Sequence, residues 1–239
     1  MSQADWDRLQ YYSRKVQFFS SLYSDDPKVH PSTYIQIAQL QSSVLFPSLR
    51  RLLYHLSPND MSISLFLFVS PLLYSLEFYN IKGIEKTIVG PFLATLSFQM
   101  LSRIVLHNRQ MSADILKKFF VHSKQLRSLE LLNAVFMSDF GLLEIVSRLP
   151  SLENFTLDAR DPASHPAHAP ENSNSQSGDR KHFDALESLS ITGSFFFIQH
   201  LLSFIDSACL KLIDASPVIK PVRNGQITSL RIFLPPLWR

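Results

Sequence analysis

The chain has 239 residues, of which 46% are hydrophobic and 18% are charged, so it can bury a substantial core and is not intrinsically disordered as a whole. Its formal net charge of +3 falls short of the basic footprint of a nucleic-acid-binding protein. The single cysteine, Cys209, excludes a disulfide framework and a zinc site built from several thiolates. We therefore expect no nucleic-acid partner. We also expect a cytoplasmic or nuclear location, since the first residues lack the apolar core of a signal peptide.

Residues 1–45 are predicted to form an N-terminal helical cap. Two segments in this region have helical patterns, WDRLQYYSRKVQFF (residues 6–19) and STYIQIAQLQSS (residues 32–43). A repeat array needs such a cap because its first unit otherwise exposes an apolar edge.

A short apolar pattern then recurs along residues 46–239. In LRSLELLN, Leu126, Leu129 and Leu131 occupy the first, fourth and sixth places and Asn133 the eighth. The same pattern begins at Leu49, Leu73, Leu101, Leu126 and Leu152, in steps of 24, 28, 25 and 26 residues. Such spacing is typical of leucine-rich repeats, in which a short strand buries the fourth and sixth residues of each unit.

The pattern is less regular toward the C-terminus. It recurs at Leu186, after a stretch rich in Pro, Ser and Asn that we predict to be a disordered insertion at 160–181. The run ITSLRIFL, from Ile227, is a further candidate unit. A degenerate unit could also lie around LKLIDASPVI (residues 210–219), or the solenoid could become irregular there.

Segments with helical spacing lie between the predicted strands. MSADILKKFFVH places Ile115, Leu116, Phe119 and Phe120 on one side, and DFGLLEIVSRL and FFFIQHLLSFI are similar, with Ser112 and Ser194 as expected N-caps. The fold class is therefore an α/β leucine-rich-repeat solenoid, right-handed, with parallel strands on its concave side and helices on its convex side. Asn80, Asn108 and Asn133 are predicted to form an asparagine ladder.

The apolar run from Ile63 to Leu76 is shorter than a bilayer span and contains Pro71. We assign it to the core, and we expect no membrane partner.

Two parts of the chain resemble a known family. DWDRLQYYSRKVQ (Asp5–Gln17) is similar to the segment that opens the leucine-rich region of many fungal (basidiomycete) F-box proteins, and the stretch from Leu45 to Phe78 is similar to their first repeats. The resemblance implies repeats that present substrates to a ubiquitin ligase. In that family an F-box precedes the segment that begins at Asp5 in this chain. Only four residues precede Asp5 here, so we expect the half of the receptor that recognises substrates. The ligase adaptor is a partner only if an F-box lies upstream.

No catalytic, cofactor or metal site is predicted. The six glycines form no dinucleotide or phosphate-binding motif. His165, His168 and His182 fall in or beside the predicted insertion and make a poor metal site. Cys209 is expected to pack in the core.

The candidate partner-binding residues come from the third, fifth and seventh places of the predicted strands, which face away from the core. From these places we select seven residues rich in Arg, aromatic and acidic side chains: Arg51, His55, Glu77, Tyr79, Arg103, His107 and Glu130. Arg and aromatic residues are enriched in protein interfaces. His55 and His107 are expected on one row, where their titration could make binding depend on pH.

The sequence thus predicts a protein-interaction module without enzymatic activity, the substrate-recognition part of an F-box-type ubiquitin-ligase receptor. One alternative is an orphan repeat scaffold without a link to ubiquitin. Another is a hydrolase that uses the histidines near the insertion.

Overall fold

The structure is a computed structural model that describes residues 2–21, 33, 36–37, 44–56, 62–80, 88–96, 100–107, 113–133, 140–158, 183–193, 195–203, 205, 209–217 and 230–233. Its helices are α1 (Gln3–Ser13), the 3-10 helix η1 (Ser62–Phe68), α3 (Gly90–Thr95), α4 (Ala113–Phe120), α5 (Phe140–Ser147) and α6 (Phe195–Ser203). Its strands are β1 (Phe18–Ser21), β2 (Arg51–His55), β3 (Ser75–Tyr79), β4 (Arg103–His107), β5 (Ser128–Leu132), β6 (Asn154–Asp158), β7 (Ser188–Gly193), β8 (Leu212–Pro217) and β9 (Leu230–Phe233).

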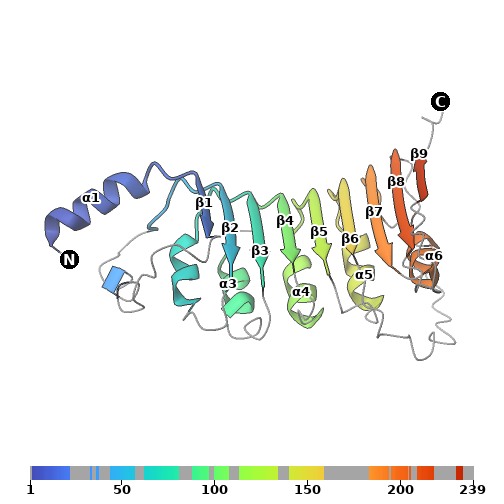
Figure 1. Cartoon of the computed structure of the whole chain (residues 1–239), viewed down its shortest axis with the longest axis horizontal. Coiled ribbons are helices and arrows are strands. Elements are labelled where there is room, and N and C mark those ends of the chain that lie inside the picture. Colours follow the sequence, from blue (N-terminus) through green and yellow to red (C-terminus); the bar gives the residue numbers. More distant parts are fainter. Residues whose placement is uncertain are drawn as a thin grey trace, which may run out of the picture.

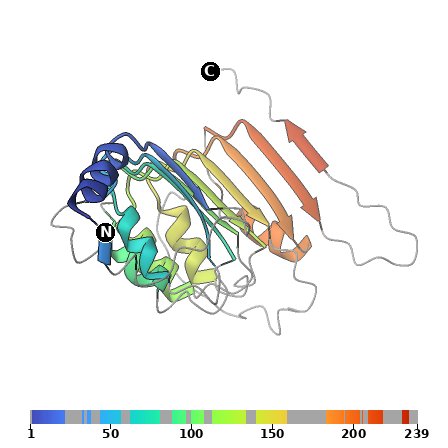
Figure 2. The ribbon, with the colours of Figure 1, turned by 60° about the vertical axis from the view of Figure 1, so that its left-hand side comes forward.

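The strands form one open sheet in which each strand lies beside its neighbour in the sequence. Strands β1 to β8 are parallel, and β9 pairs antiparallel with β8. Helices α3, α4 and α5 cover one face of the sheet and leave the other face open (Figures 1 and 2). The chain therefore has an α/β fold with a solenoid-like arrangement.

The predicted strand register is confirmed. Strands β2 to β6 each occupy the third to seventh places counted from Leu49, Leu73, Leu101, Leu126 and Leu152. The fourth-place side chains, such as Leu76 and Leu129, are fully buried, and nearly all sixth-place side chains are buried as well. Because alternate residues of a strand face opposite sides, this register turns one apolar row of each strand toward the helices.

The helices that connect successive strands complete the core, as predicted. In α4, Leu116, Phe119 and Phe120 are buried while Lys118 is exposed. These side chains belong to one continuous apolar cluster that runs from Leu49 to Ala215. Much of the segment 63–76 also joins this cluster, including Leu65 and Phe68.

The same backbone contact recurs between successive units, including those whose sequence spacing is irregular. The carbonyl of the second-place residue in each unit accepts two N–H groups from the second- and third-place residues of the next unit, at 2.8–3.1 Å. The accepting carbonyls belong to Gln17, Arg50, Tyr74, Ser102, Arg127, Glu153 and Glu187. These contacts define eight successive units, the first of which begins at Val16 and the last at Leu210.

The N-terminal region differs from its prediction. Helix α1 begins with a capping box, in which the Ser2 hydroxyl accepts from the Asp5 N–H and the Asp5 carboxylate accepts from the Ser2 N–H. The Ser2 hydroxyl also donates to Asp5 Oδ2 at 2.6 Å, and this bond, followed by the one from the Ser2 N–H, lowers the pKa of Asp5. The helix ends at Ser13, and Phe18–Ser21 forms β1, paired with β2. The predicted helix over residues 6–19 is therefore wrong beyond Ser13, because Val16, which follows the helix, and Phe19 in β1 both pack against the core.

A helical cap over 1–45 is accordingly not confirmed. Helix α1 extends away from the sheet (Figure 1), and Ser13 is its only buried residue. Of the second predicted helix, over 32–43, the structure describes only residues 33, 36 and 37, all helical.

The C-terminal region resolves the alternatives left open by the sequence. The segment around LKLIDASPVI contributes β8, parallel to β7, so a degenerate unit is present there. The run from Ile227 contributes β9, which is antiparallel. The prediction of a further parallel unit at Ile227 is therefore wrong.

Several predicted features lie outside the described residues, namely the insertion 160–181 with its histidines, Asn108, and the N-caps Ser112 and Ser194. Cys209 is described and is exposed, so its predicted core position is wrong. It lies in the turn before β8, two residues from Lys211, which is also exposed.

Candidate functional site

The open face of the sheet consists of the third-, fifth- and seventh-place side chains of the strands, as predicted. Most of them are exposed or half-buried. Ser75 and Val105 are exceptions, because both are buried although no helix covers them. Neighbouring side chains on the open face must therefore close over these two positions.

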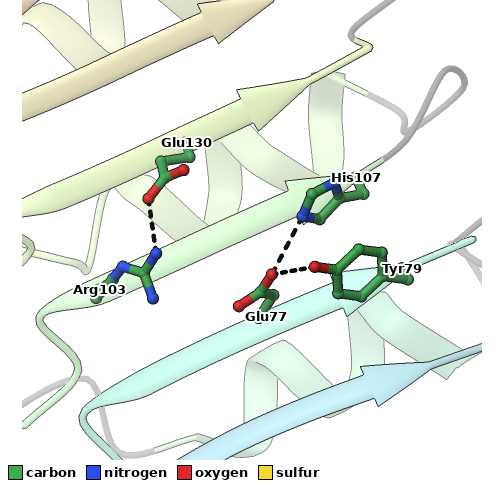
Figure 3. Close-up of polar contacts among 5 residues, drawn as sticks. All are labelled: Glu77, Tyr79, Arg103, His107 and Glu130. Carbon is green, nitrogen blue, oxygen red and sulfur yellow. Dashed lines mark hydrogen bonds and ion pairs between the residues drawn. The ribbon is translucent and has the colours of Figure 1, made fainter. Parts of the chain in front are cut away.

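The neighbours form a polar cluster of Glu77, Tyr79, Arg103, His107 and Glu130 on β3, β4 and β5 (Figure 3). One oxygen of the Glu77 carboxylate, Oε1, accepts a hydrogen bond from the Tyr79 hydroxyl at 2.5 Å. The same oxygen lies 3.2 Å from Nε2 of His107. When the imidazole is neutral and carries its proton on Nε2, two uncharged donors on adjacent strands hold this carboxylate.

The register explains why these side chains meet. Tyr79 and His107 lie opposite each other on β3 and β4, and their rings stack with centroids 3.9 Å apart and planes at 13°. Glu77 precedes Tyr79 by two residues, which places both on the same face of the strand. Its carboxylate therefore reaches the imidazole diagonally.

A second diagonal contact has the same geometry. Arg103 donates from its guanidinium Nη2 to Glu130 Oε1 at 2.8 Å, from β4 to a residue two places farther along β5. The Arg103 and Glu130 side chains remain 37% and 28% exposed. The two contacts flank Val105, which lies opposite both Glu77 and Glu130 in the register.

The remaining two candidate residues lie on β2, outside the polar cluster. Both are exposed, and the guanidinium carbon of Arg51 lies 5.4 Å from the centre of the Phe18 ring on β1. His55 and His107 do share a row, with Tyr79 between them. Their proposed effect on the pH dependence of binding stays a prediction.

The surroundings of Tyr79 in the polar cluster favour the protonated phenol. The hydrogen bond to Glu77, followed by burial and the negative charges of Glu77 and Glu130, raises the pKa of Tyr79 to about 12. The phenol is therefore a hydrogen-bond donor at neutral pH and not a base. Among the residues that the structure describes, no group of three or more His, Cys, Asp and Glu side chains could hold a metal ion.

Sequence reasoning found all five members of the cluster but not their contacts. A signal for the Arg103–Glu130 pair was present, since opposite charges occupy the third and fifth places of successive units. A charge pattern also exists at the second place, where Arg127 pairs with Glu153 at 3.1 Å and Lys211 with Glu187 at 2.9 Å. Phe18 was missed because the segment 6–19 reads as a helix.

Comparison with known proteins identifies no relative: no protein-family model, no curated protein and no solved structure matches the chain. Within the described ranges, no helix is long and apolar enough to cross a membrane.

The Tyr79–Glu77 contact predicts a specific loss of stability at alkaline pH. Because the folded state raises the pKa of Tyr79 from its ordinary value of 10.0 to about 12, the unfolded chain loses the phenolic proton first as the pH rises. The contact therefore stabilises the fold fully below pH 10 and progressively less as the pH rises toward 12. Urea unfolding across this range should show the decline in the native protein and a smaller one in Glu77→Gln. Equal declines would contradict the contact.

Proposed function

We propose that the chain is a leucine-rich-repeat solenoid whose open face binds a protein partner, and that it serves as the substrate-recognition part of an F-box-type ubiquitin-ligase receptor in the cytosol or nucleus. The repeat assignment is supported by the spacing of the apolar pattern and by the backbone contact that recurs between units. Solenoids of this kind use their extended open surface for recognition.

The polar cluster is the observation that carries the binding proposal. Its Arg, Tyr and His side chains are of the kinds that anchor protein interfaces, and the contacts within the cluster fix their orientations before a partner arrives. A preorganised surface loses less conformational entropy on binding.

The ligase role rests on the resemblance of Asp5–Gln17 and Leu45–Phe78 to the fungal F-box family. The first stretch contains most of α1 and ends just before β1, and the second contains β2 and most of β3, which pair in parallel. The alternative is an orphan scaffold that binds a partner without directing it to ubiquitin transfer.

The binding proposal is tested by proximity labelling in the source cells with the native protein and three variants. Tyr79→Ala and Arg103→Glu alter the polar cluster, whereas Lys118→Glu reverses an exposed charge on α4, on the opposite face. Anchor residues contribute about 2 kcal/mol or more, so recovery of true partners should fall about 30-fold in the first two variants and remain unchanged in Lys118→Glu. Equal recovery from all four proteins would remove the open face as the binding site.

The ligase role requires a separate measurement. The protein should be tagged at its own locus, and the cullin-ligase adaptor should copurify with it. Deleting the locus should also lengthen the half-lives of the proteins that depend on the polar cluster for capture. Partner capture without either effect would favour the orphan scaffold.

A further inference from the structure

A groove with a volume of about 370 Å³ lies on the helix-covered face, where α4 and α5 end side by side. Phe120 and Leu149, both buried, contribute to its lining with the partly buried Ile145. Val121 and Pro150 are exposed residues of the same lining. The groove belongs to the opposite side of the sheet from the polar cluster.

The groove has an exposed apolar rim. Val121 follows the last residue of α4, and 57% of it is exposed. It extends the buried apolar lining of Phe120 outward to solvent. Apolar surface that continues from the core into a concavity is typical of a docking site for an apolar side chain.

Among the described residues, the lining of the groove has one basic side chain without an ion-pair partner. Its two charged lining residues are Lys124 and Arg148, both exposed. Arg148 pairs with Glu144, one turn earlier in α5, whereas Lys124 has no hydrogen-bond or ion-pair partner among the residues that the structure describes. The adjoining segment 117–128 contains Lys117, Lys118, Lys124 and Arg127 and no acidic residue, and of these Arg127 pairs with Glu153.

These cations are not needed to satisfy the ends of the two helices. The Ser123 hydroxyl donates to the Phe119 carbonyl at 2.9 Å, and its N–H donates to the Phe120 carbonyl at 3.0 Å. In α5, the Ser147 hydroxyl donates to the Glu144 carbonyl at 2.8 Å, and the Leu149 N–H donates to the Val146 carbonyl at 3.1 Å. Since the chain's own donors occupy these carbonyls, Lys124 remains available to an external anion.

We propose that the groove binds an acidic peptide segment of a partner protein, in which one large apolar side chain enters beside Phe120 and Leu149 while neighbouring carboxylates pair with Lys124 and Arg148. A volume of about 370 Å³ is near the lower limit for ligand sites and suits one or two side chains better than a cofactor. Residues 159–182 of the chain itself contain no Leu, Ile, Val, Met or aromatic residue other than His, so they do not supply the apolar group. A recessed apolar lining also suits a protruding side chain better than the flat surface of a bilayer.

The test is fluorescence anisotropy of the full chain with a short labelled peptide that carries a central phenylalanine flanked by glutamates. Lys124→Glu, Arg148→Gln and Val121→Asp each change an exposed lining residue, and Lys118→Glu is the matched charge control outside the groove. We expect Lys124→Glu and Val121→Asp to raise the dissociation constant about tenfold or more and Arg148→Gln severalfold, with a change of about twofold or less for Lys118→Glu. A peptide with glutamine in place of glutamate should bind about tenfold more weakly.

Three outcomes would overturn the proposal. The first is equal binding of the glutamine peptide, and the second is an equal loss in Lys118→Glu and Lys124→Glu, which would indicate attraction to general positive charge. The third is that the protein binds phosphatidylserine vesicles but not the peptide, and that Lys124→Glu abolishes the binding of vesicles. That result would make the surface a lipid site. Urea unfolding of each variant establishes that the fold is retained.

Discussion

Leu129→Ala is expected to lower the free energy of unfolding by about 2–5 kcal/mol. Leu129 is fully buried in β5, between Ile104 on β4 and Phe155 on β6. Truncation removes its contacts with both neighbouring units, and a parallel sheet cannot relax to fill the space without shifting the strand register. Urea unfolding followed by circular dichroism would measure the loss.

Leu132→Ala is the matched control for this prediction. It makes the same substitution in the same strand, but Leu132 is at the seventh place on the open face and is only partly buried. Its cost should be about 1 kcal/mol or less. Similar losses in the two variants would mean that the assignment of the two faces is wrong.

Asn80→Ala is expected to cost about 2–4 kcal/mol for two separable reasons. Asn80 has a φ of 53°, in the left-handed region that alanine disfavours. Its side-chain amide also donates to the carbonyl of Leu56 at 2.9 Å, and Leu56 is fully buried. Without the amide, that carbonyl loses its hydrogen bond to the Asn80 side chain.

Three further variants separate these contributions. Asn80→Gly tolerates the positive φ and should retain only the hydrogen-bond cost, about 1–3 kcal/mol. Asn133 has a φ of 55°, and its side chain makes no hydrogen bond with the part of the chain that the structure describes. Asn133→Ala should therefore cost about 1–2 kcal/mol and Asn133→Gly almost nothing. If Asn80→Gly were as stable as the native protein, the bond to Leu56 would contribute nothing.

The candidate site was predicted in composition but not in organisation. The place of a residue within its unit decides which face its side chain joins, and that place can be counted from the first leucine. The contact of Glu77 with His107 instead joins residues thirty positions apart. It depends on which unit stacks on which and on the side-chain conformations that then become accessible, so it required the folded chain.

The sequence by itself determined the register of β2 to β7, because burying alternate residues leaves one alignment of each strand in which the leucines face the helices. The tertiary structure alone decided the features at the ends. The segment FFSS has no strong local preference and becomes β1 because β2 offers it backbone partners, while β9 runs antiparallel although its apolar pattern matches that of the parallel units. Strand direction and pairing are properties of neighbouring segments in space, and an apolar pattern with a period of two residues is the same in either direction.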